Sequence, residues 1–152
     1  MNLSPALYFN DAAKFHLGRG DSQTVKLVRF GDGVSRVTPL LGDWDNTGTQ
    51  KPGLYFYDHP VTRRAEFHLG NYEGQTTTVI PFGDTGNLGV PVVGDWDGSG
   101  SDKPGLYFHD HPISRRAEFH LRIGAGNTKV VHFGNTGNSG IPVVGDWMGD
   151  HR

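Results

Sequence analysis

The 152-residue chain contains no cysteine, so it can form no disulfide bond and offers no thiolate nucleophile. Its apolar runs are only a few residues long, which is too short for a membrane-spanning helix. Its net charge of −2 excludes the strongly basic surface of a typical nucleic-acid-binding domain. The first residues lack the charged and apolar regions of a signal peptide, so none is expected. We therefore predict neither a nucleic acid nor a membrane as partner, and the compartment stays open.

Glycine and aromatic residues are abundant instead. The chain has 23 Gly, 9 Pro, 3 Trp, 5 Tyr and 9 Phe, with 35% hydrophobic and 20% charged residues. So many aromatic residues argue against a disordered chain, because disordered chains lack them. No stretch repeats its apolar residues with the 3.6-residue period of a helix of three turns. The composition predicts a soluble β domain that is rich in turns.

The chain consists of three copies of one unit. Residues 51–69 and 103–121 are identical at 16 of 19 positions, at an offset of 52 residues. The Gly-Asp-Trp motif recurs at Gly42, Gly94 and Gly145, in steps of 52 and 51. The copies cover approximately residues 5–50, 51–102 and 103–152, and the first has one loop that is five residues shorter.

Each copy predicts four short strands. In the second copy we place them at Gly53–Phe56, Arg64–Leu69, Thr76–Phe82 and Val90–Trp96. Apolar and polar residues alternate along the second of these, and β-branched residues fill the third. Clusters of Gly, Pro, Asn and Asp separate them. Four strands at a spacing near 50 residues are typical of the blades of a β-propeller.

The repeats are similar to a known family. Phe82-Gly83, then VPVVGDWDGSG from Val90, then GLYF from Gly105 resembles the FG-GAP/VCBS propeller repeats, the type found in integrin α-chains. The resemblance covers residues 5–147. It implies that the Gly-Asp-Trp segment is the innermost strand A of a blade, followed by strands B, C and D. It carries little information on function, since such blades serve adhesion, sugar binding and hydrolysis alike.

In this assignment the first strand of the chain, Ala6–Phe9, is a strand B and the last, Ile141–Trp147, is a strand A. Three blades cannot close a ring, because propellers commonly have four to eight. We therefore predict half a β-propeller over residues 1–152 that closes as a six-bladed homodimer. In this dimer the C-terminal strand of each subunit completes the first blade of its partner. The alternative is that the chain is a fragment of a longer propeller.

The loops after Gly-Asp-Trp resemble calcium-binding loops. Asp95, Asp97 and Ser99 occupy the first, third and fifth positions, but Lys103 stands where the family often has an aspartate, and Met148 replaces the third-position aspartate in the last copy. Calcium is possible, yet these loops are degenerate, so we predict no cofactor. The alternative is that the first aspartate of each loop holds a tight turn by accepting backbone N–H bonds. These aspartates are Asp43, Asp95 and Asp146.

Strand C carries a histidine at the same position in each copy, namely His16, His68 and His120. These residues lie one per blade, too far apart to share a zinc ion. We predict no metal site and expect each ring to bond neighbouring backbone.

The B–C loop carries the most chemistry. It reads DHPVTRR at 58–64 and DHPISRR at 110–116, but only NDA at 10–12 in the first copy. In propellers this loop shares a rim with the D–A loop, here GDTGN at 83–87 and GNTGN at 134–138. Carboxylate, imidazole, guanidinium and amide groups on one rim suit a polyol ligand, and an aromatic ring can stack on a sugar. The predicted ligand-binding residues are Tyr57, His59, Arg63, Arg64, His111, Arg115, Arg116, Asp84, Asn87, Asn135 and Asn138. The alternative is an Asp–Arg network that only holds the loop shut.

Glu66 and Glu118 follow the paired arginines and, with Asp58 and Asp110, offer the two carboxylates of a glycosidase. The alternative is that Glu66 pairs with Arg64. Three functions follow. The first is a lectin-like, carbohydrate-binding propeller. The second is a small glycoside hydrolase that uses these four carboxylates, and the third is a structural adhesion repeat. The sequence does not name the sugar.

Overall fold

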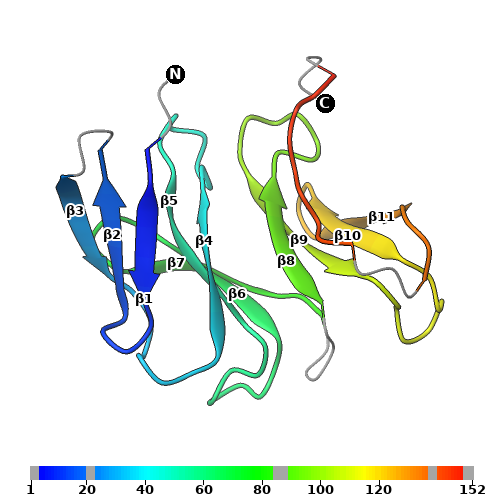
Figure 1. Ribbon diagram of the computed structural model, residues 1–152, viewed down its shortest axis with the longest axis horizontal. Coiled ribbons are helices and arrows are strands. Elements are labelled where there is room, and N and C mark those ends of the chain that lie inside the picture. Colours follow the sequence, from blue (N-terminus) through cyan, green and yellow to red (C-terminus); the bar gives the residue numbers. More distant parts are fainter. Residues whose placement is uncertain (1–3, 20–22, 84–88, 137–139, 149–152) are drawn as a thin grey trace. The chain divides into compact units, whose positions relative to one another are not determined.

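The computed structural model describes residues 4–19, 23–83, 89–136 and 140–148. These residues form eleven β-strands and no helix, so the described part of the chain holds no helix that could cross a membrane. The strands form antiparallel sheets of three, four and four strands (Figure 1). The predicted all-β class is therefore confirmed, as is the division into repeated sheets. The chain divides into two compact units, residues 1–41 with 51–82 and residues 42–50 with 83–152.

The first sheet comes from the first repeat. It contains β1 (Ala6–Phe9), β2 (Lys14–Gly18) and β3 (Thr24–Arg29), in that order. Strand β1 pairs with β2 along one edge, from Ala6 opposite Leu17 to Phe9 opposite Lys14. Among the described residues no strand pairs with its other edge. The first sheet thus contains three strands in chain order, as predicted for the first repeat.

The second sheet belongs to the same unit. Its order is β4 (Val37–Gly42), β5 (Lys51–Phe56), β6 (Glu66–Gly70) and β7 (Thr76–Pro81). This is the A-B-C-D order expected of one blade. Val37–Gly42 takes the place of strand A, although its sequence differs from the VPVVG of the next copy.

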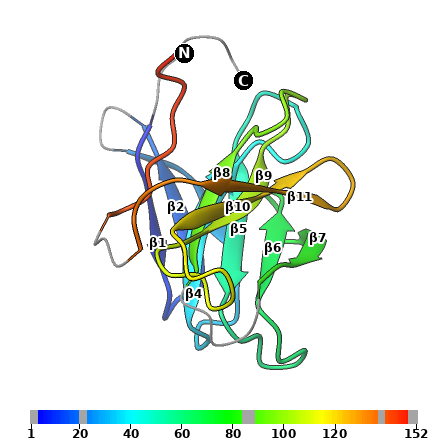
Figure 2. The ribbon, with the colours of Figure 1, turned by 90° about the vertical axis from the view of Figure 1, so that its right-hand side faces the viewer.

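The third sheet lies in the other unit and repeats this order. It contains β8 (Val90–Gly94), β9 (Lys103–Phe108), β10 (Glu118–Ile123) and β11 (Asn127–His132). Strand β10 lies between β9 and β11 (Figure 2).

Several predicted strand bounds were wrong, and one predicted strand is absent. The first and third strands of the second copy are Lys51–Phe56 and Thr76–Pro81, against the predicted Gly53–Phe56 and Thr76–Phe82. The predicted strand from Arg64 begins at Glu66, because the preceding arginine, Arg63, has a left-handed backbone with φ of 56° that breaks the extended chain. The predicted strand over Val90–Trp96 ends at Gly94. The predicted strand over 141–147 is absent, since the described residues 140–148 have no strand hydrogen-bonded to them.

A hydrophobic core joins the two sheets of the first unit. Its buried side chains are Phe15, Val28, Phe30, Leu54 and Phe56. Burial of each such side chain contributes roughly 1.5–3 kcal/mol. This core fixes the central strand β5, and with it the start of the loop that follows at residue 57.

Candidate functional site

The B–C loops of the second and third repeats have the same backbone structure. In the second repeat the N–H of His59 donates to the Arg64 carbonyl at 2.9 Å, and the N–H of Arg63 donates to the His59 carbonyl at 2.8 Å. The third repeat has both bonds at the same lengths, between His111, Arg116 and Arg115. Arg63 and Arg115 are left-handed, with φ of 56° and 59°. A non-glycine residue in this region is strained by roughly 1–2 kcal/mol, so the surrounding contacts must enforce the loop.

An ion pair closes each loop. The Arg63 guanidinium donates to Oδ2 of Asp58 at 2.6 Å, and Arg115 lies 2.8 Å from Oδ2 of Asp110. The Asp–Arg pairing that the sequence offered as the alternative to a ligand site is therefore present in both loops. Within the described residues, Oδ1 of each aspartate is buried without a hydrogen-bond partner.

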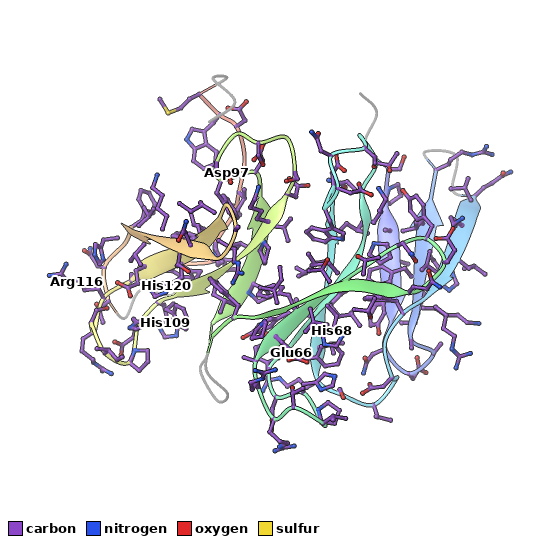
Figure 3. All side chains as sticks on the ribbon, turned by 180° about the vertical axis from the view of Figure 1, so that it is seen from behind. Glu66, His68, Asp97, His109, Arg116 and His120 are labelled. Carbon is purple, nitrogen blue, oxygen red and sulfur yellow. The ribbon has the colours of Figure 1, made fainter. Side chains whose placement is uncertain are left out.

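Glu66 and His68 lie on one face of strand β6, because residues two apart in a strand point to the same side. The Nε2 atom of His68 lies 2.8 Å from Oε1 of Glu66, and the two side chains lie together in Figure 3. His120 and Glu118 have the same distance in β10. For His68 and His120 the prediction that the ring bonds neighbouring backbone was wrong, since the glutamate two positions earlier is its partner.

A second imidazole reaches the same carboxylate from the B–C loop. The Nδ1 atom of His59 lies 3.5 Å from Oε1 of Glu66 and also accepts long bonds from the N–H groups of Val61 and Thr62, at 3.3 and 3.4 Å. The His59 and His68 rings are stacked, with centroids 4.9 Å apart. The Phe56 ring contacts both imidazoles. The B–C loop thus places the His59 ring beside Glu66, which lies on the following strand β6.

The third repeat reproduces this arrangement. His111 lies 3.5 Å from Oε1 of Glu118 and is stacked on His120 with centroids 4.8 Å apart. It also adds a contact, since Nδ1 of His132 lies 3.1 Å from Oε2 of Glu118. The residue at the facing position of the neighbouring strand explains the difference, because Glu118 faces His132 whereas Glu66 faces Pro81.

Glu66 is only 1% exposed and yet is held in its ionised form. Burial alone raises the pKa of its carboxyl group. Hydrogen bonds from His68 and Thr62 and the nearby imidazoles outweigh burial and lower the pKa below its usual value. Glu118 follows the same balance, with His120, Ser114 and His111 as the corresponding groups.

The second oxygen of Glu66, Oε2, is buried and has no hydrogen-bond partner among the described residues. The nearest cation is Arg64, whose Nη2 lies 3.9 Å away on a side chain that is 58% exposed. The predicted Glu66–Arg64 pair is therefore a long contact, secondary to the two histidines.

Two sets of side chains could hold a metal ion: His59 with Glu66 and His68, and His111 with Glu118 and His120. In each set the ligand atoms lie within 4.8 Å of one another. Sequence reasoning compared histidines between blades and so missed these sets, each of which lies within a single blade. The available signal was a loop histidine seven residues before a Glu-x-His.

The first repeat lacks this set. It has Lys14 in place of the glutamate, and its shortened loop has no histidine, although His16 remains.

The two loops of the predicted rim meet in the third repeat. The Thr136 hydroxyl, in the D–A loop, donates to the carbonyl of Arg115 in the B–C loop at 2.6 Å. Asn135 is exposed beside this bond. The Arg116 side chain extends away from the sheet (Figure 3). The predicted residues Asp84, Asn87 and Asn138 lie outside the described residues.

The predicted aromatic platform, Tyr57, is in contact with other groups. The Arg36 guanidinium lies over its ring, 4.4 Å from the centroid, and its hydroxyl lies 3.0 Å from the hydroxyl of Thr38. The third repeat has His109 at this position. Arg36 thus covers one face of the ring that a sugar would use.

The calcium-like loops hold turns. The Asp95 carboxylate accepts the N–H groups of Ser99 and Gly100 at 3.0 and 2.8 Å. The Asp43 carboxylate accepts those of Thr47 and Gly48, both at 2.9 Å. The turn-holding alternative is thus confirmed for these two aspartates.

Lys103 donates hydrogen bonds to the oxygens of the calcium-like loop that contains Asp97 and Ser99. Lys103 Nζ lies 2.9 Å from Oδ1 of Asp97 and 2.5 Å from the Ser99 hydroxyl. This bond, more than any other contact, holds the pKa of Asp97 well below its usual range. A cation supplied by the chain itself therefore lies among the oxygens that a calcium ion would need.

A groove follows the open edge of the first sheet. It has a volume of about 230 Å³ and is largely apolar. It is lined by Ala6, Leu7, Tyr8, Phe15, Pro39, Leu40 and Leu41.

Comparison with protein-family models, with curated proteins and with solved structures found no match to this chain. The resemblance to FG-GAP/VCBS repeats accordingly stays a prediction from the sequence.

Proposed function

We propose that this chain is a glycan-binding module in which each complete B–C loop forms one shallow site for an acidic saccharide. The observation that carries the proposal is the repeated left-handed arginine, Arg63 in one loop and Arg115 in the other. Strained residues persist where other contacts enforce them, and they are concentrated at functional sites. Here the strain sets the direction of the residue that follows, Arg64 or Arg116.

The charge of these loops supports an acidic ligand. Asp58 neutralises Arg63, but the carboxylate nearest to Arg64 is buried and already engaged by two histidines. The exposed guanidinium of Arg64 can therefore pair with a carboxylate or sulfate of a sugar through two parallel hydrogen bonds. Two weak sites in one chain would gain affinity for a polymeric ligand through avidity.

Hydrolysis has less support than binding. A glycosidase needs one carboxyl group with a raised pKa to act as general acid. The pKa values of Glu66 and Glu118 are both lowered, and Asp58 and Asp110 are held by arginines. None of the four groups is thereby favoured as the acid.

The test is binding of uronic-acid or sulfated oligosaccharides by isothermal titration calorimetry, with neutral oligosaccharides alongside. We expect the double variant Arg64→Ala/Arg116→Ala to lose binding. Lys129→Ala is the control, because it removes a positive charge at an exposed position of β11, outside both B–C loops. Equal binding by the wild-type protein and the double variant would contradict the proposal, as would turnover of an aryl glycoside that stops in Glu118→Gln.

We further propose that a second copy of the chain completes the first blade, as in the six-bladed dimer. Residues 140–147 read GIPVVGDW and match residues 89–96 at seven of eight positions. The latter segment forms β8 beside β9. The former forms no strand, and its Ile141 is 84% and its Val143 75% exposed. An apolar segment of this kind fits the apolar groove along β1 and would satisfy the open strand edge.

Size-exclusion chromatography with light scattering tests this assembly at micromolar concentration. We expect a dimer for the wild-type chain and a monomer for Val143→Asp, which places a charge in the apolar groove. Val34→Asp is the control, since Val34 is 85% exposed and lies outside the groove. A monomeric wild-type chain, or a Val143→Asp variant that stays dimeric, would contradict the proposed strand exchange.

A further inference from the structure

We propose that the second and third repeats each bind one divalent transition-metal ion, of the zinc class. The ligands are His59, Glu66 and His68 in one site and their repeat equivalents His111, Glu118 and His120 in the other. This inference does not depend on the proposed glycan binding.

The distances already approach those of a zinc site. Zinc bonds of about 2.0–2.1 Å in tetrahedral directions separate neighbouring ligand atoms by roughly 3.3 Å. Oε1 of Glu66 lies 2.8 Å from Nε2 of His68 and 3.5 Å from Nδ1 of His59. Each of these two oxygen–nitrogen separations therefore needs to change by only a few tenths of an ångström. The two nitrogens lie no more than 4.8 Å apart, so their separation must shorten by up to about 1.5 Å when the ion binds.

The chemistry of the three groups suits such an ion. Two imidazoles and one carboxylate are a ligand set that zinc accepts, with a fourth position left for water or another oxygen ligand. The bonds that Nδ1 of His59 accepts from Val61 and Thr62 are 3.3 and 3.4 Å long, longer than the usual 2.9–3.0 Å. Little hydrogen bonding is therefore lost when that lone pair turns to a metal.

Burial and charge also favour a cation at this place. The Glu66 carboxylate is 1% exposed, and its Oε2 atom has no hydrogen-bond partner among the described residues. Its nearest permanent cation is the largely exposed Arg64 at 3.9 Å. A buried charge is stable only when it is paired or coordinates a metal. The Phe56 ring, in contact with both imidazoles, gives the site an apolar wall.

The chain contains its own negative control. The first repeat keeps His16 but has Lys14 in place of the glutamate and no loop histidine. An ammonium group at that position repels a metal ion. The number of metal ions per chain should therefore be two, and not three as the repeat count would give.

The experiment titrates Zn²⁺ into tag-free protein that has been treated with a chelator, using calorimetry and elemental analysis after gel filtration. We expect two ions per chain for the wild type, one for Glu66→Gln or Glu118→Gln, and none for the double variant. Each single variant should weaken its own site at least about 10-fold. Because Gln is isosteric with Glu, circular dichroism should show an unchanged fold.

A matched control and a second readout separate this site from adventitious surface binding. His109→Ala removes an exposed histidine outside both sets and should leave two ions bound. Co²⁺ in place of Zn²⁺ should give the visible absorption of four-coordinate cobalt, reduced by half in His59→Ala. The proposal is overturned if the wild type retains no metal, if it binds three ions, or if the double glutamine variant binds as many ions as the wild type.

Discussion

The Nε2 atom of His68 lies 2.8 Å from Oε1 of Glu66, and the same distance separates His120 from Glu118. Each pair lies on one strand and shares a face because its members are two residues apart. In both cases the glutamate is buried and the imidazole is its nearest partner. A substitution of either residue is therefore expected to change both the stability of the protein and the properties of this site.

Glu66→Ala should destabilise the metal-free protein by about 1–3 kcal/mol, because it leaves the partly buried imidazole of His68 without its carboxylate partner. Glu66→Gln should lose less, since its amide oxygen can still accept a hydrogen bond from Nε2. Urea unfolding in the presence of a chelator measures both changes. Lys14→Ala, at the equivalent position of the first repeat, should stay within about 0.5 kcal/mol of the wild type. If Ala and Gln at position 66 were equally destabilising, the hydrogen bond to His68 would not be the source of the effect.

Asp97→Asn should destabilise the protein at neutral pH and much less in acid. Folding lowers the pKa of Asp97, chiefly through its hydrogen bond with Lys103, so the folded state favours the ionised carboxylate. This stabilisation is present above the unfolded pKa of about 3.9 and is lost as the pH falls through the lower folded pKa. It should stay below about 1 kcal/mol, since the pair lies near the surface. The melting temperatures of the two proteins should therefore converge below about pH 4, and a difference that is constant with pH would contradict this account.

The sequence was sufficient to predict the sheets, because each near-identical segment from Lys51 and from Lys103 forms the same two strands. The alternation along these segments identifies which residues share a face. It therefore placed Glu66 and His68 on the same side of a strand.

The site itself was beyond sequence reasoning for a physical reason. The loop brings His59 back onto Glu66 only because Arg63 adopts a left-handed backbone, a conformation that sequence usually signals with glycine or asparagine. No such residue stands there. The strand predicted over residues 141–147 is absent for another reason. The near-identical segment at 89–96 forms β8 beside β9, whereas no described strand pairs with residues 140–147.

Gly70→Ala should destabilise the first unit by about 1–3 kcal/mol, because it overpacks a filled core. A methyl group at Gly70 would lie 2.4 Å from the Phe30 ring, and Phe30 is itself buried. Neither the ring nor strand β6 can move without opening the core. Thr78→Ala, at an exposed position of the neighbouring strand β7, should change stability by less than about 0.5 kcal/mol. Thermal unfolding of both variants measures the difference, and a Gly70→Ala variant as stable as Thr78→Ala would show that the core yields at this point.

The two proposed metal sites should differ in zinc affinity, because only the glutamate of the third repeat has an additional histidine in contact with its second carboxylate oxygen. Nδ1 of His132 lies 3.1 Å from Oε2 of Glu118, whereas Pro81 occupies the facing position in the second repeat. A group that holds a ligand from behind fixes its orientation, and its loss commonly lowers metal affinity 10–100-fold. His132→Ala should therefore weaken zinc binding about 10-fold in a Glu66→Gln background, where only the third-repeat site remains. The same substitution in a Glu118→Gln background should leave the affinity of the second-repeat site unchanged. Calorimetric titration of both double variants measures the two affinities, and an equal loss in the two backgrounds would mean that His132 acts on the fold and not on Glu118.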